Sequence, residues 1–343
     1  MTIVTDETAS APRADLSVDP LAARIVVATV NYRAGDLVLQ GLPALIEELS
    51  RFAQGVAVVV DNASPNGDGE RLAEGLGAMG SPAAVRLVRS PLNGGFAAGN
   101  NLAFAEAKAL GWIPDAILLL NPDAEMRPGA IEEMVRVMFS RPRVGVVGAR
   151  LENEDGSTWI AAFHFPTPMR EFAGELGLGA LVRRWPTLIE ETGTPAEADW
   201  VSGACMMINT RLIDELGPLD ETYFLYFEEV DYQLQAHRAG WEVWHVPDAL
   251  VMHIAGASTG IVEGVAKEGP MPAYWFASWR RYYVKNHGPV QARLAAAAKL
   301  AGIWLGDLQR RLRGKPPVHR PPRFAPDFAR ACLLGRARAS SDS

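Results

Sequence analysis

Short apolar runs alternate with stretches of helical spacing through the first 150 residues. The runs are rich in Val, Ile and Leu, as is typical of buried strands, and they lie at 24–30, 56–60, 85–88, 117–120 and 144–149. Stretches in which apolar residues recur every three or four positions predict helices at 37–52, 96–110 and 130–139. Because strands that alternate with helices build βαβ units, the pattern predicts an α/β fold with a doubly wound, mainly parallel sheet and flanking helices.

The second half of the chain is less regular. Residues 152–199 contain several prolines and predict a variable excursion over the sheet. A regular pattern resumes at 200–209, a helix is expected at 211–216, and closing strands are expected at 242–246 and 249–253. From 273 the pattern is helical and basic, which predicts a C-terminal helical extension. The expected organisation is a disordered leader at 1–22, an α/β domain at 23–262, a basic helical extension at 263–315 and a Pro-rich, disordered tail at 316–343.

The composition is typical of a globular protein of the cytoplasm. Of the 343 residues 48% are hydrophobic and 21% charged, which is an ordinary globular profile, and the first 21 residues have no apolar signal-peptide core. No uncharged apolar run is long enough to span a bilayer. Cys205 and Cys332 are far apart in the sequence and lack the spacing of metal ligands, so we expect free thiols and a cytoplasmic protein.

The charge is unevenly distributed. The net charge is −7, yet residues 275–323 hold eleven Lys or Arg and a single acid, Asp307. Of two anionic partners for such a segment, nucleic acid and a membrane surface, we expect the membrane, with Trp275, Trp279 and Trp304 at the border of a basic amphipathic helix on the inner face of the plasma membrane. The alternative is a helical pair that packs on the α/β domain, with its arginines merely solvated.

Polar residues gather at three places where strands end or helices begin. The segments are Asp-Asn-Ala-Ser at 61–64, Asn-Gly-Gly-Phe-Ala-Ala-Gly-Asn-Asn at 93–101 and Asn-Pro-Asp at 121–123. Taken singly, each also suits a turn or a helix cap. Together they indicate a nucleotide site, because open α/β sheets bind ligands at the carboxyl ends of their strands. The chain has no Gly-x-Gly-x-x-Gly after the first strand and no Walker loop, which argues against a dehydrogenase or a P-loop NTPase.

These segments carry different chemistry. Asp61 can accept hydrogen bonds from a base or a ribose, whereas the glycines and amides of 93–101 suit anionic groups near a helix start. Asp123 supplies a hard oxygen ligand for Mg²⁺ or Mn²⁺. His253 ends a strand and is a further candidate ligand, although a lone histidine is more often structural.

A second cluster lies within the aromatic stretch 223–232. Glu228, Glu229 and Asp231 place three acids within four residues. On a helix, Glu228 and Asp231 share a face and Glu229 points elsewhere. Apolar neighbours raise the pKa of a carboxyl group, which makes such a residue a candidate general base.

In this order, the segments resemble the inverting glycosyltransferases of family 2, which have the GT-A fold, and most of all the rhamnosyltransferase-type members that act on cell-envelope glycans. The resemblance extends over about residues 25–258. It rests on Thr-Val-Asn-Tyr at 29–32, the three strand-end segments, Glu-Glu-Val-Asp at 228–231 and His253.

The resemblance implies a role for each matched residue. For the donor, it implies that Asn31, Tyr32 and Asp61 line the site of the nucleobase and ribose, and that the phosphate side is shaped by Asn93, Gly95, Phe96 and Asn100. It implies that Asp123 and His253 hold Mg²⁺ or Mn²⁺. For the reaction, it implies that Glu229 is the catalytic base and that Asp231 binds the acceptor or orients the site. The sequence departs from the family pattern at two positions. Asn121 stands where the family has the first acidic residue of its metal-binding motif. Glu229 stands where the family has Asp as the catalytic base, so Glu228 is an alternative candidate for the base.

The implied activity is transfer of a sugar, with rhamnose from dTDP-rhamnose as the first expectation, from a nucleotide-sugar donor to a hydroxyl of a cell-envelope glycan or polyprenyl-linked saccharide. A single displacement would invert the anomeric carbon. Two alternatives stay open. A sugar nucleotidyltransferase usually has a Gly-rich loop after its first strand, which is missing here, and a non-catalytic glycan-binding or scaffold protein leaves the acid cluster unexplained.

Overall fold

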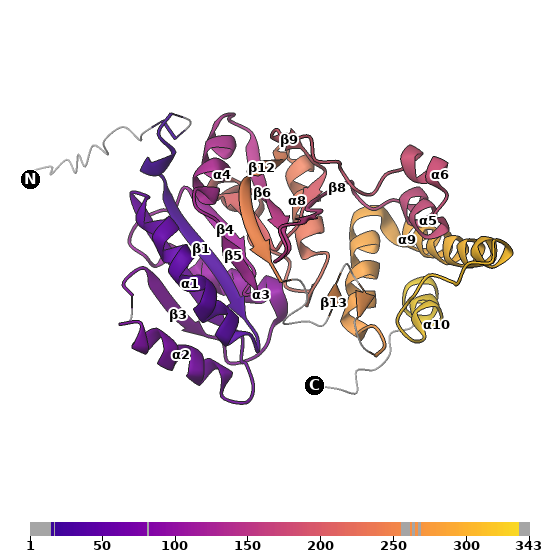
Figure 1. Cartoon of the computed structure of the whole chain (residues 1–343), viewed down its shortest axis with the longest axis horizontal. Helices are drawn as coiled ribbons and strands as arrows, with labels where there is room; N and C mark the ends of the chain where they lie inside the picture. The colour runs from indigo at the N-terminus through magenta and orange to yellow at the C-terminus, as the bar shows by residue number, and fades with distance from the viewer. Residues whose placement is uncertain are drawn as a thin grey trace, which may run out of the picture.

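A long sheet forms the centre of the molecule (Figure 1). The computed structural model describes residues 15–16, 18–80, 82–254, 261–262, 265–266 and 269–335. The strands lie in the order β3-β2-β1-β4-β11-β6-β12-β5, and the short β7 and β9 pair with β6 and β12. The main strands are β1 (Arg24–Asn31), β2 (Gln54–Asp61), β3 (Val85–Arg89), β4 (Ala116–Leu120), β5 (Ala124–Met126), β6 (Val144–Glu152), β11 (Cys205–Asn209) and β12 (Glu242–His253).

The first half of the sheet is parallel, as the sequence predicts. β1 pairs in parallel with both β2 and β4, and β2 with β3. Continuous apolar runs are typical of parallel strands because helices cover both of their faces. The second half is mixed, since β11 enters antiparallel between β4 and β6, while β12 is parallel to β6. The two expected closing strands at 242–246 and 249–253 are one strand, β12, with a register shift between Val246 and Leu250.

Helices cover both faces of the sheet. Side chains of β1 alternate between them: Ile25 and Val27 face one apolar core and Val26 and Ala28 the other. The first core is closed by α1 (Gly35–Ser50), α2 (Asp68–Ala78) and α4 (Ala130–Phe139). The second is closed by α3 (Gly95–Lys108), α7 (Thr210–Leu216) and α8 (Glu228–Arg238).

The segment expected as an irregular excursion is partly helical; its short strands β7 and β9 join the sheet, and its two helices lie away from it. Its elements are β7 (Thr158–Trp159), β8 (Ala162–Phe163), α5 (Pro168–Leu176), α6 (Gly179–Arg184), β9 (Ala196–Glu197) and β10 (Trp200–Val201). The Thr167 side chain caps α5 by accepting a hydrogen bond from Arg170 N, with Pro168 in the first turn. α5 packs against the long C-terminal helix α9 (Ala273–Leu312) rather than over the sheet.

α9 consists of two helical halves. Gly288 has φ +83° and ψ 165°, which is not helical, and Pro289 follows it. The proximal half, 273–287, buries Trp275 and Trp279 against α10 (Phe324–Phe328). These tryptophans therefore belong to an internal aromatic core and not to a membrane border, as the packed-helix alternative expects.

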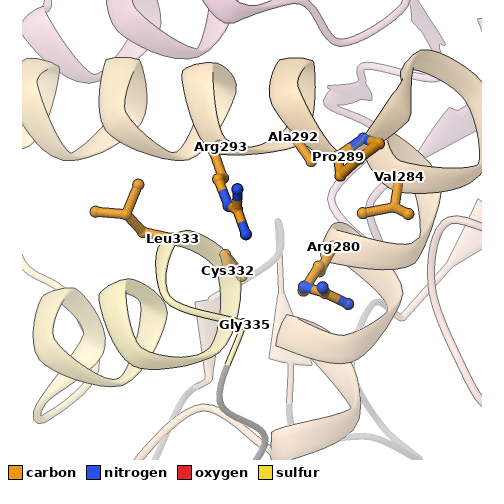
Figure 2. A pocket seen from close by; sticks show the side chains of 8 residues that line it. All are labelled: Arg280, Val284, Pro289, Ala292, Arg293, Cys332, Leu333 and Gly335. Carbon is orange, nitrogen blue, oxygen red and sulfur yellow. The ribbon is translucent and has the colours of Figure 1, made fainter.

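The chain after residue 316 also differs from the expected tail. α10 and the π-helix η2 (Ala329–Leu333) return to α9, and they bury Phe324, Phe328 and Cys332. Figure 2 shows η2 facing α9 across a cavity of about 20 Å³, beside Cys332. Both cysteines are buried free thiols. Other short elements are η1 (Pro20–Ala22), β13 (Ile261–Val262) and β14 (Val265–Ala266), while residues 1–14 of the expected leader and 336–343 of the expected tail lie outside the described residues.

A buried ionic network joins α5 to α9. Lys299 Nζ lies 2.9 Å from Glu171 Oε2 and 2.8 Å from Glu175 Oε1, and Arg320 donates to Glu175 at 3.0 Å. Trp279 Nε1 also donates to Glu171. A buried charge is tolerated where opposite charges and hydrogen bonds surround it, so this network requires that the two helices stay in register.

Glycines allow α5 and α9 to approach closely. A Cβ at Gly302 would lie 2.6 Å from the carbonyl oxygen of Phe172, and one at Gly306 would lie 2.5 Å from that of Glu175. Both obstacles are backbone atoms, which cannot rotate away.

We expect Gly302→Ala to lower the free energy of unfolding by about 1–3 kcal/mol, because the clash exceeds the gain in helix propensity. The matched control is Gly174→Ala, an exposed glycine of α5 with no atom near its Cβ position, which should raise stability by about 0.5–1 kcal/mol. Urea unfolding measures both. If Gly302→Ala were as stabilising as the control, the close helix contact would be wrong.

Candidate functional site

The expected site residues meet at one edge of the sheet. Asn31 and Asp61 are the last residues of β1 and β2 and are paired in register. Residues 93–101, here called the glycine loop, follow β3, and Asn121 follows β4. Because these strands are parallel, their carboxyl ends share an edge, which is where open α/β sheets bind ligands.

Asn31 organises a buried polar cluster. Its Nδ2 donates to Asp61 Oδ1 at 3.1 Å and to Asp68 Oδ2 at 2.9 Å, and its Oδ1 accepts from Ala34 N at 3.0 Å. Gly69 completes the cluster, since a Cβ there would lie 2.2 Å from Asp61 Oδ2. Asn31 therefore positions Asp61, while Tyr32, which the resemblance implies beside it, is half-buried.

Asp68 is a site neighbour that sequence reasoning missed. Its carboxylate accepts hydrogen bonds from Asn31 Nδ2 and Gly35 N, so it holds the starts of α1 and α2 together. The signal was present in the sequence: Asp68 follows Asn66-Gly67, a turn pair, at the first position of a helix.

Asn62 ties β2 to the glycine loop. Its Nδ2 donates to Asn93 Oδ1 at 2.9 Å and to Gly95 O at 3.0 Å. Asn93 Oδ1 also accepts from Gly95 N at 3.0 Å. Asn100 donates to Phe96 O within α3, and its Oδ1 is buried with no hydrogen-bond partner among the described residues. The Oδ1 atom of Asn100 is therefore free to accept a hydrogen bond from a ligand.

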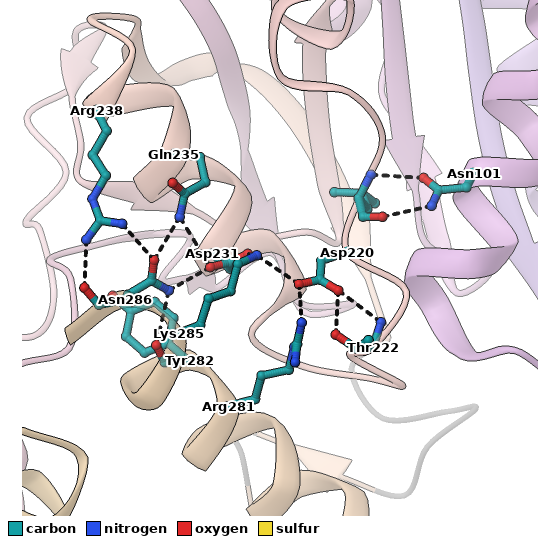
Figure 3. Close-up of polar contacts among 11 residues, drawn as sticks. Asn101, Asp220, Thr222, Asp231, Gln235, Arg238, Arg281, Tyr282, Lys285 and Asn286 are labelled. Carbon is teal, nitrogen blue, oxygen red and sulfur yellow. Dashed lines mark hydrogen bonds and ion pairs between the residues drawn. The ribbon is translucent and has the colours of Figure 1, made fainter. Parts of the chain in front are cut away.

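A backbone contact fastens the glycine loop to residues 219–229, here called the acid loop. Phe96 N donates to Phe224 O at 2.8 Å. Gly95 has φ +85°, and a Cβ there would lie 1.9 Å from Phe224 O, so no other residue fits. Asn101 adds a second tie, since its amide both donates to Leu219 O and accepts from Leu219 N (Figure 3).

The two residues of the acid loop that directly precede α8 have a strained backbone. Tyr226 and Phe227 have φ values of +68° and +71°. Such conformations are costly for bulky residues and persist where the surrounding structure imposes them. They deliver Glu228 and Glu229 to the first turn of α8. Glu229 Cβ lies 3.5 Å from the Cβ position of Gly203, a point that the Phe96 ring also approaches.

The two glutamates are electrostatically unusual. Burial raises the pKa of Glu229 to about 7. Burial, and then the neighbouring Glu229 charge, hold the pKa of Glu228 well above its ordinary value. Each has an Oε2 with no hydrogen-bond partner among the described residues. A carboxyl group with a pKa near 7 is suited to proton transfer at neutral pH.

Asp231 has a different environment. Lys285 Nζ lies 2.6 Å from its Oδ2, and Asn286 Nδ2 donates to its Oδ1 at 2.6 Å (Figure 3). Lys285 also pairs with Asp220 at 2.8 Å. The side chain of Asp231 is thus engaged by α9 and fixes α8 against that helix, and its expected role in binding an acceptor or orienting the site stays a prediction.

Asp123 and His253 come together across the β5–β12 pair. His253 Nε2 lies 3.2 Å from Asp123 Oδ1 and 3.3 Å from Asn121 Nδ2. Both Asp123 and His253 are buried, and Ile254 N donates to Asp123 O. In the described part of the chain no group of three His, Cys, Asp or Glu side chains converges. The residues suit a divalent cation that takes one carboxylate and one imidazole from the protein and its other ligands from a bound anion.

Comparison with known proteins agrees with this arrangement. The model of the glycosyltransferase like family 2 matches residues 22–268, more than half of the chain. The chain belongs to this family. The family 2 domain thus includes the polar edge of the sheet, the glycine loop and the acid loop.

Relatives of this family 2 member include rhamnosyltransferases. The N-acetylglucosaminyl-diphospho-decaprenol L-rhamnosyltransferase of Mycobacterium tuberculosis is 30% identical over 187 residues, which are 51% of this chain and 61% of that protein. The rhamnosyltransferase WbbL of Escherichia coli is 26% identical over 165 residues, covering 47% of this chain and 61% of that protein. The matches therefore span about three-fifths of these relatives' own length.

Solved structures show the same fold. GalNAc-T7, solved with UDP, GalNAc and Mn²⁺, matches with a TM-score of 0.56 at 15% identity, over 91% of this chain and 57% of that one. Staphylococcus aureus TarS 1–349 in complex with UDP matches with a TM-score of 0.50 at 12% identity, over 84% of this chain and 74% of that one. These likenesses confirm the expected GT-A-type α/β fold, with a mixed sheet and a C-terminal helical extension.

The raised pKa of Glu228 predicts a stability that depends on pH. An acid whose pKa is higher in the folded state than its ordinary 4.5 destabilises the fold increasingly as pH rises above that ordinary value. We expect Glu228→Gln to raise the free energy of unfolding by about 1–3 kcal/mol at pH 8 and to have a smaller effect near pH 4.5. Thermal unfolding across this pH range measures the difference.

The control is Glu74→Gln on the exposed face of α2, which should change stability little at either pH. If Glu228→Gln changed the free energy of unfolding by the same amount at every pH, the carboxyl group of Glu228 would not be held in an environment that disfavours its charge.

Proposed function

We propose that the chain is an inverting hexosyltransferase that moves a sugar from a nucleotide-sugar donor to an acceptor hydroxyl, with Glu229 as the general base. The observation that carries this proposal is the position of Glu229: a carboxyl group with a pKa of about 7, whose loop is fastened to the glycine loop by the Phe96–Phe224 hydrogen bond. Family membership supports the reaction class.

The donor is proposed to bind along the polar edge of the sheet. Asp61, positioned by Asn31, would accept hydrogen bonds from the nucleobase or ribose beside Tyr32. Asn93, Gly95, Phe96 and Asn100 would border the diphosphate at the start of α3, where backbone N–H groups favour an anion.

Asp123 and His253 would hold Mg²⁺ or Mn²⁺, and Asn121 lies beside them. A divalent cation in this place would stabilise the negative charge on the leaving diphosphate. The Mn²⁺ and UDP present in the GalNAc-T7 structure are in keeping with this assignment.

The chemical step is a single displacement. Glu229 takes the proton of the acceptor hydroxyl as its oxygen forms the new bond to the anomeric carbon. The bond from that carbon to the diphosphate breaks on the opposite face, and the nucleoside diphosphate leaves. Attack from the face opposite the leaving group inverts the configuration. A base must be deprotonated to act, so the rate should rise with pH up to about 7 and then level off.

The names of the relatives favour a particular pair of substrates. The mycobacterial relative is named for transfer of L-rhamnose to N-acetylglucosaminyl-diphospho-decaprenol, and WbbL is a rhamnosyltransferase. We therefore propose dTDP-rhamnose as the donor and a polyprenyl-diphosphate-linked saccharide or another cell-envelope glycan as the acceptor. Such an acceptor places the reaction on the cytoplasmic face of a membrane.

The direct experiment is binding and slow hydrolysis of a panel of dTDP-, UDP- and GDP-sugars, with Mg²⁺, with Mn²⁺ and with EDTA. One donor should raise the temperature of unfolding in the presence of metal and release its sugar slowly. If no nucleotide sugar had either effect, the proposed activity would be wrong.

Replacing the base should affect turnover rather than donor binding. Glu229→Gln is expected to lower kcat by about 10²–10⁴-fold with little change in donor KM, because it removes proton transfer and keeps the shape of the side chain. Glu228→Gln is the matched variant and should keep kcat within about tenfold of the unmodified enzyme. The reverse pattern would assign the base to Glu228.

Removal of the acidic metal ligand should be visible without catalysis. Asp123→Asn is expected to weaken Mn²⁺ binding by roughly 10–100-fold, since a neutral amide replaces the carboxylate. Titration of Mn²⁺ in the presence of the nucleoside diphosphate measures this. Asp155→Asn, in an exposed loop, serves as the control and should bind Mn²⁺ normally.

A further inference from the structure

The distal half of α9, residues 289–312, carries an uncovered apolar stripe. Val290, Trp304 and Leu312 are 66%, 67% and 81% exposed, and between them lie further exposed apolar side chains. The members of the stripe are Val290, Leu294, Ala297, Ala301, Trp304, Leu305, Leu308 and Leu312.

The stripe is a second apolar face of one helix. Its members recur at steps of mostly three and four residues, which keeps them on one side. The opposite side is occupied by packing: Ala292, Ala295 and Ile303 are buried there, and Gly302 and Gly306 contact the backbone of α5. A helix needs only one apolar face to pack on its domain, so an exposed contiguous stripe of this kind marks an interaction surface.

The charges around the stripe favour an anionic partner. Between residues 289 and 315 Asp307 is the single acid, and Arg320 already pairs with it at 3.0 Å. Arg311, Arg313 and Lys315 are exposed at the end of the helix beside Leu312. A second copy packed parallel to the first would bring these cations against one another, which disfavours that mode of self-association.

No helix in the described part of the chain has the length and hydropathy needed to cross a bilayer. A basic helix with one exposed apolar face, arginines at its end and a Trp within the face is suited to lie along a lipid surface, with its apolar side chains among the acyl chains and its cations at the phosphates.

We infer that this stripe docks the enzyme on an anionic lipid membrane. Of the aromatic residues that the sequence pattern indicates, Trp275 and Trp279 are buried in the proximal half, and only Trp304 lies in the exposed stripe. The inference rests on the proposed function in one respect: docking on the membrane would bring the enzyme to a lipid-linked acceptor.

The same helix connects the membrane face to the acid loop. In the proximal half, Ser278 Oγ donates to Leu225 O at 2.9 Å, and the Tyr274 ring lies 5.2 Å from that of Phe224. Docking of the distal half would therefore orient the acid loop, with Glu229 at its end, relative to the lipid surface.

Vesicle flotation of the full chain tests the inference, with phosphatidylcholine vesicles that contain or lack phosphatidylglycerol. The protein should float with the anionic vesicles. Leu308→Gln combined with Leu312→Gln should lower the fraction bound by at least about tenfold, because two apolar side chains leave the acyl region. Each of Arg311→Gln and Arg313→Gln should lower binding by about fivefold on the anionic vesicles only.

The matched control is Ile113→Gln, which removes a 61% exposed apolar side chain elsewhere and should float like the unmodified protein. The inference is overturned if the unmodified protein stays in solution, if the leucine variants float normally, or if sedimentation velocity shows a dimer that those variants abolish in the absence of vesicle binding. Flotation uses neither donor nor acceptor, so its failure is distinct from loss of nucleotide-sugar binding, which is measured separately in solution.

Discussion

The site depends on one backbone hydrogen bond, from Phe96 N to Phe224 O. It joins the glycine loop to the acid loop, two segments that lie more than a hundred residues apart in the chain, and it requires a residue without a Cβ at Gly95. Through it, the glutamates at the start of α8 take their place beside the edge of the sheet. The strained φ values of Tyr226 and Phe227 are tolerated because this bond and the Asn101–Leu219 pair hold the middle and the start of the acid loop.

Local pattern predicts the parallel half of this fold well. The runs that become β1, β2 and β4 are largely apolar, and polar residues stand at or directly after their ends, so strand identity and the position of Asp61 follow from short-range sequence. The antiparallel entry of β11, the β5–β12 pair and the packing of α5 on α9 depend on contacts between distant segments. The approach of Gly302 to Phe172 O is one such contact, and no periodicity in either helix indicates it.

The chemistry was harder to predict than the location. A strand-end Asn can contact a ligand or hold the scaffold, and the same residue type serves both. Asn31 shows the second role, since its Nδ2 has acceptors in Asp61 and Asp68 and its Oδ1 has a donor in Ala34 N. Asn100 instead retains a buried acceptor without a partner among the described residues. The hydrogen bonds separate these cases: they engage Asn31 within the scaffold and leave Asp61 as the residue that we propose contacts the donor.

The three acids at the start of α8 have different neighbours, and these neighbours give them different properties. Lys285 neutralises Asp231, and it is the buried Asp231 carboxylate that would lose its charged partner if this ion pair were broken. Burial raises the pKa values of Glu228 and Glu229 in the direction a base requires, and the Glu229 charge raises that of Glu228 further. Glu228 is nearly inaccessible, at 3% exposure, whereas Glu229 faces Gly203 and the glycine loop. Of the two glutamates, the proposed base Glu229 is therefore the more accessible, and α9, by holding Asp231, fixes the helix that carries it.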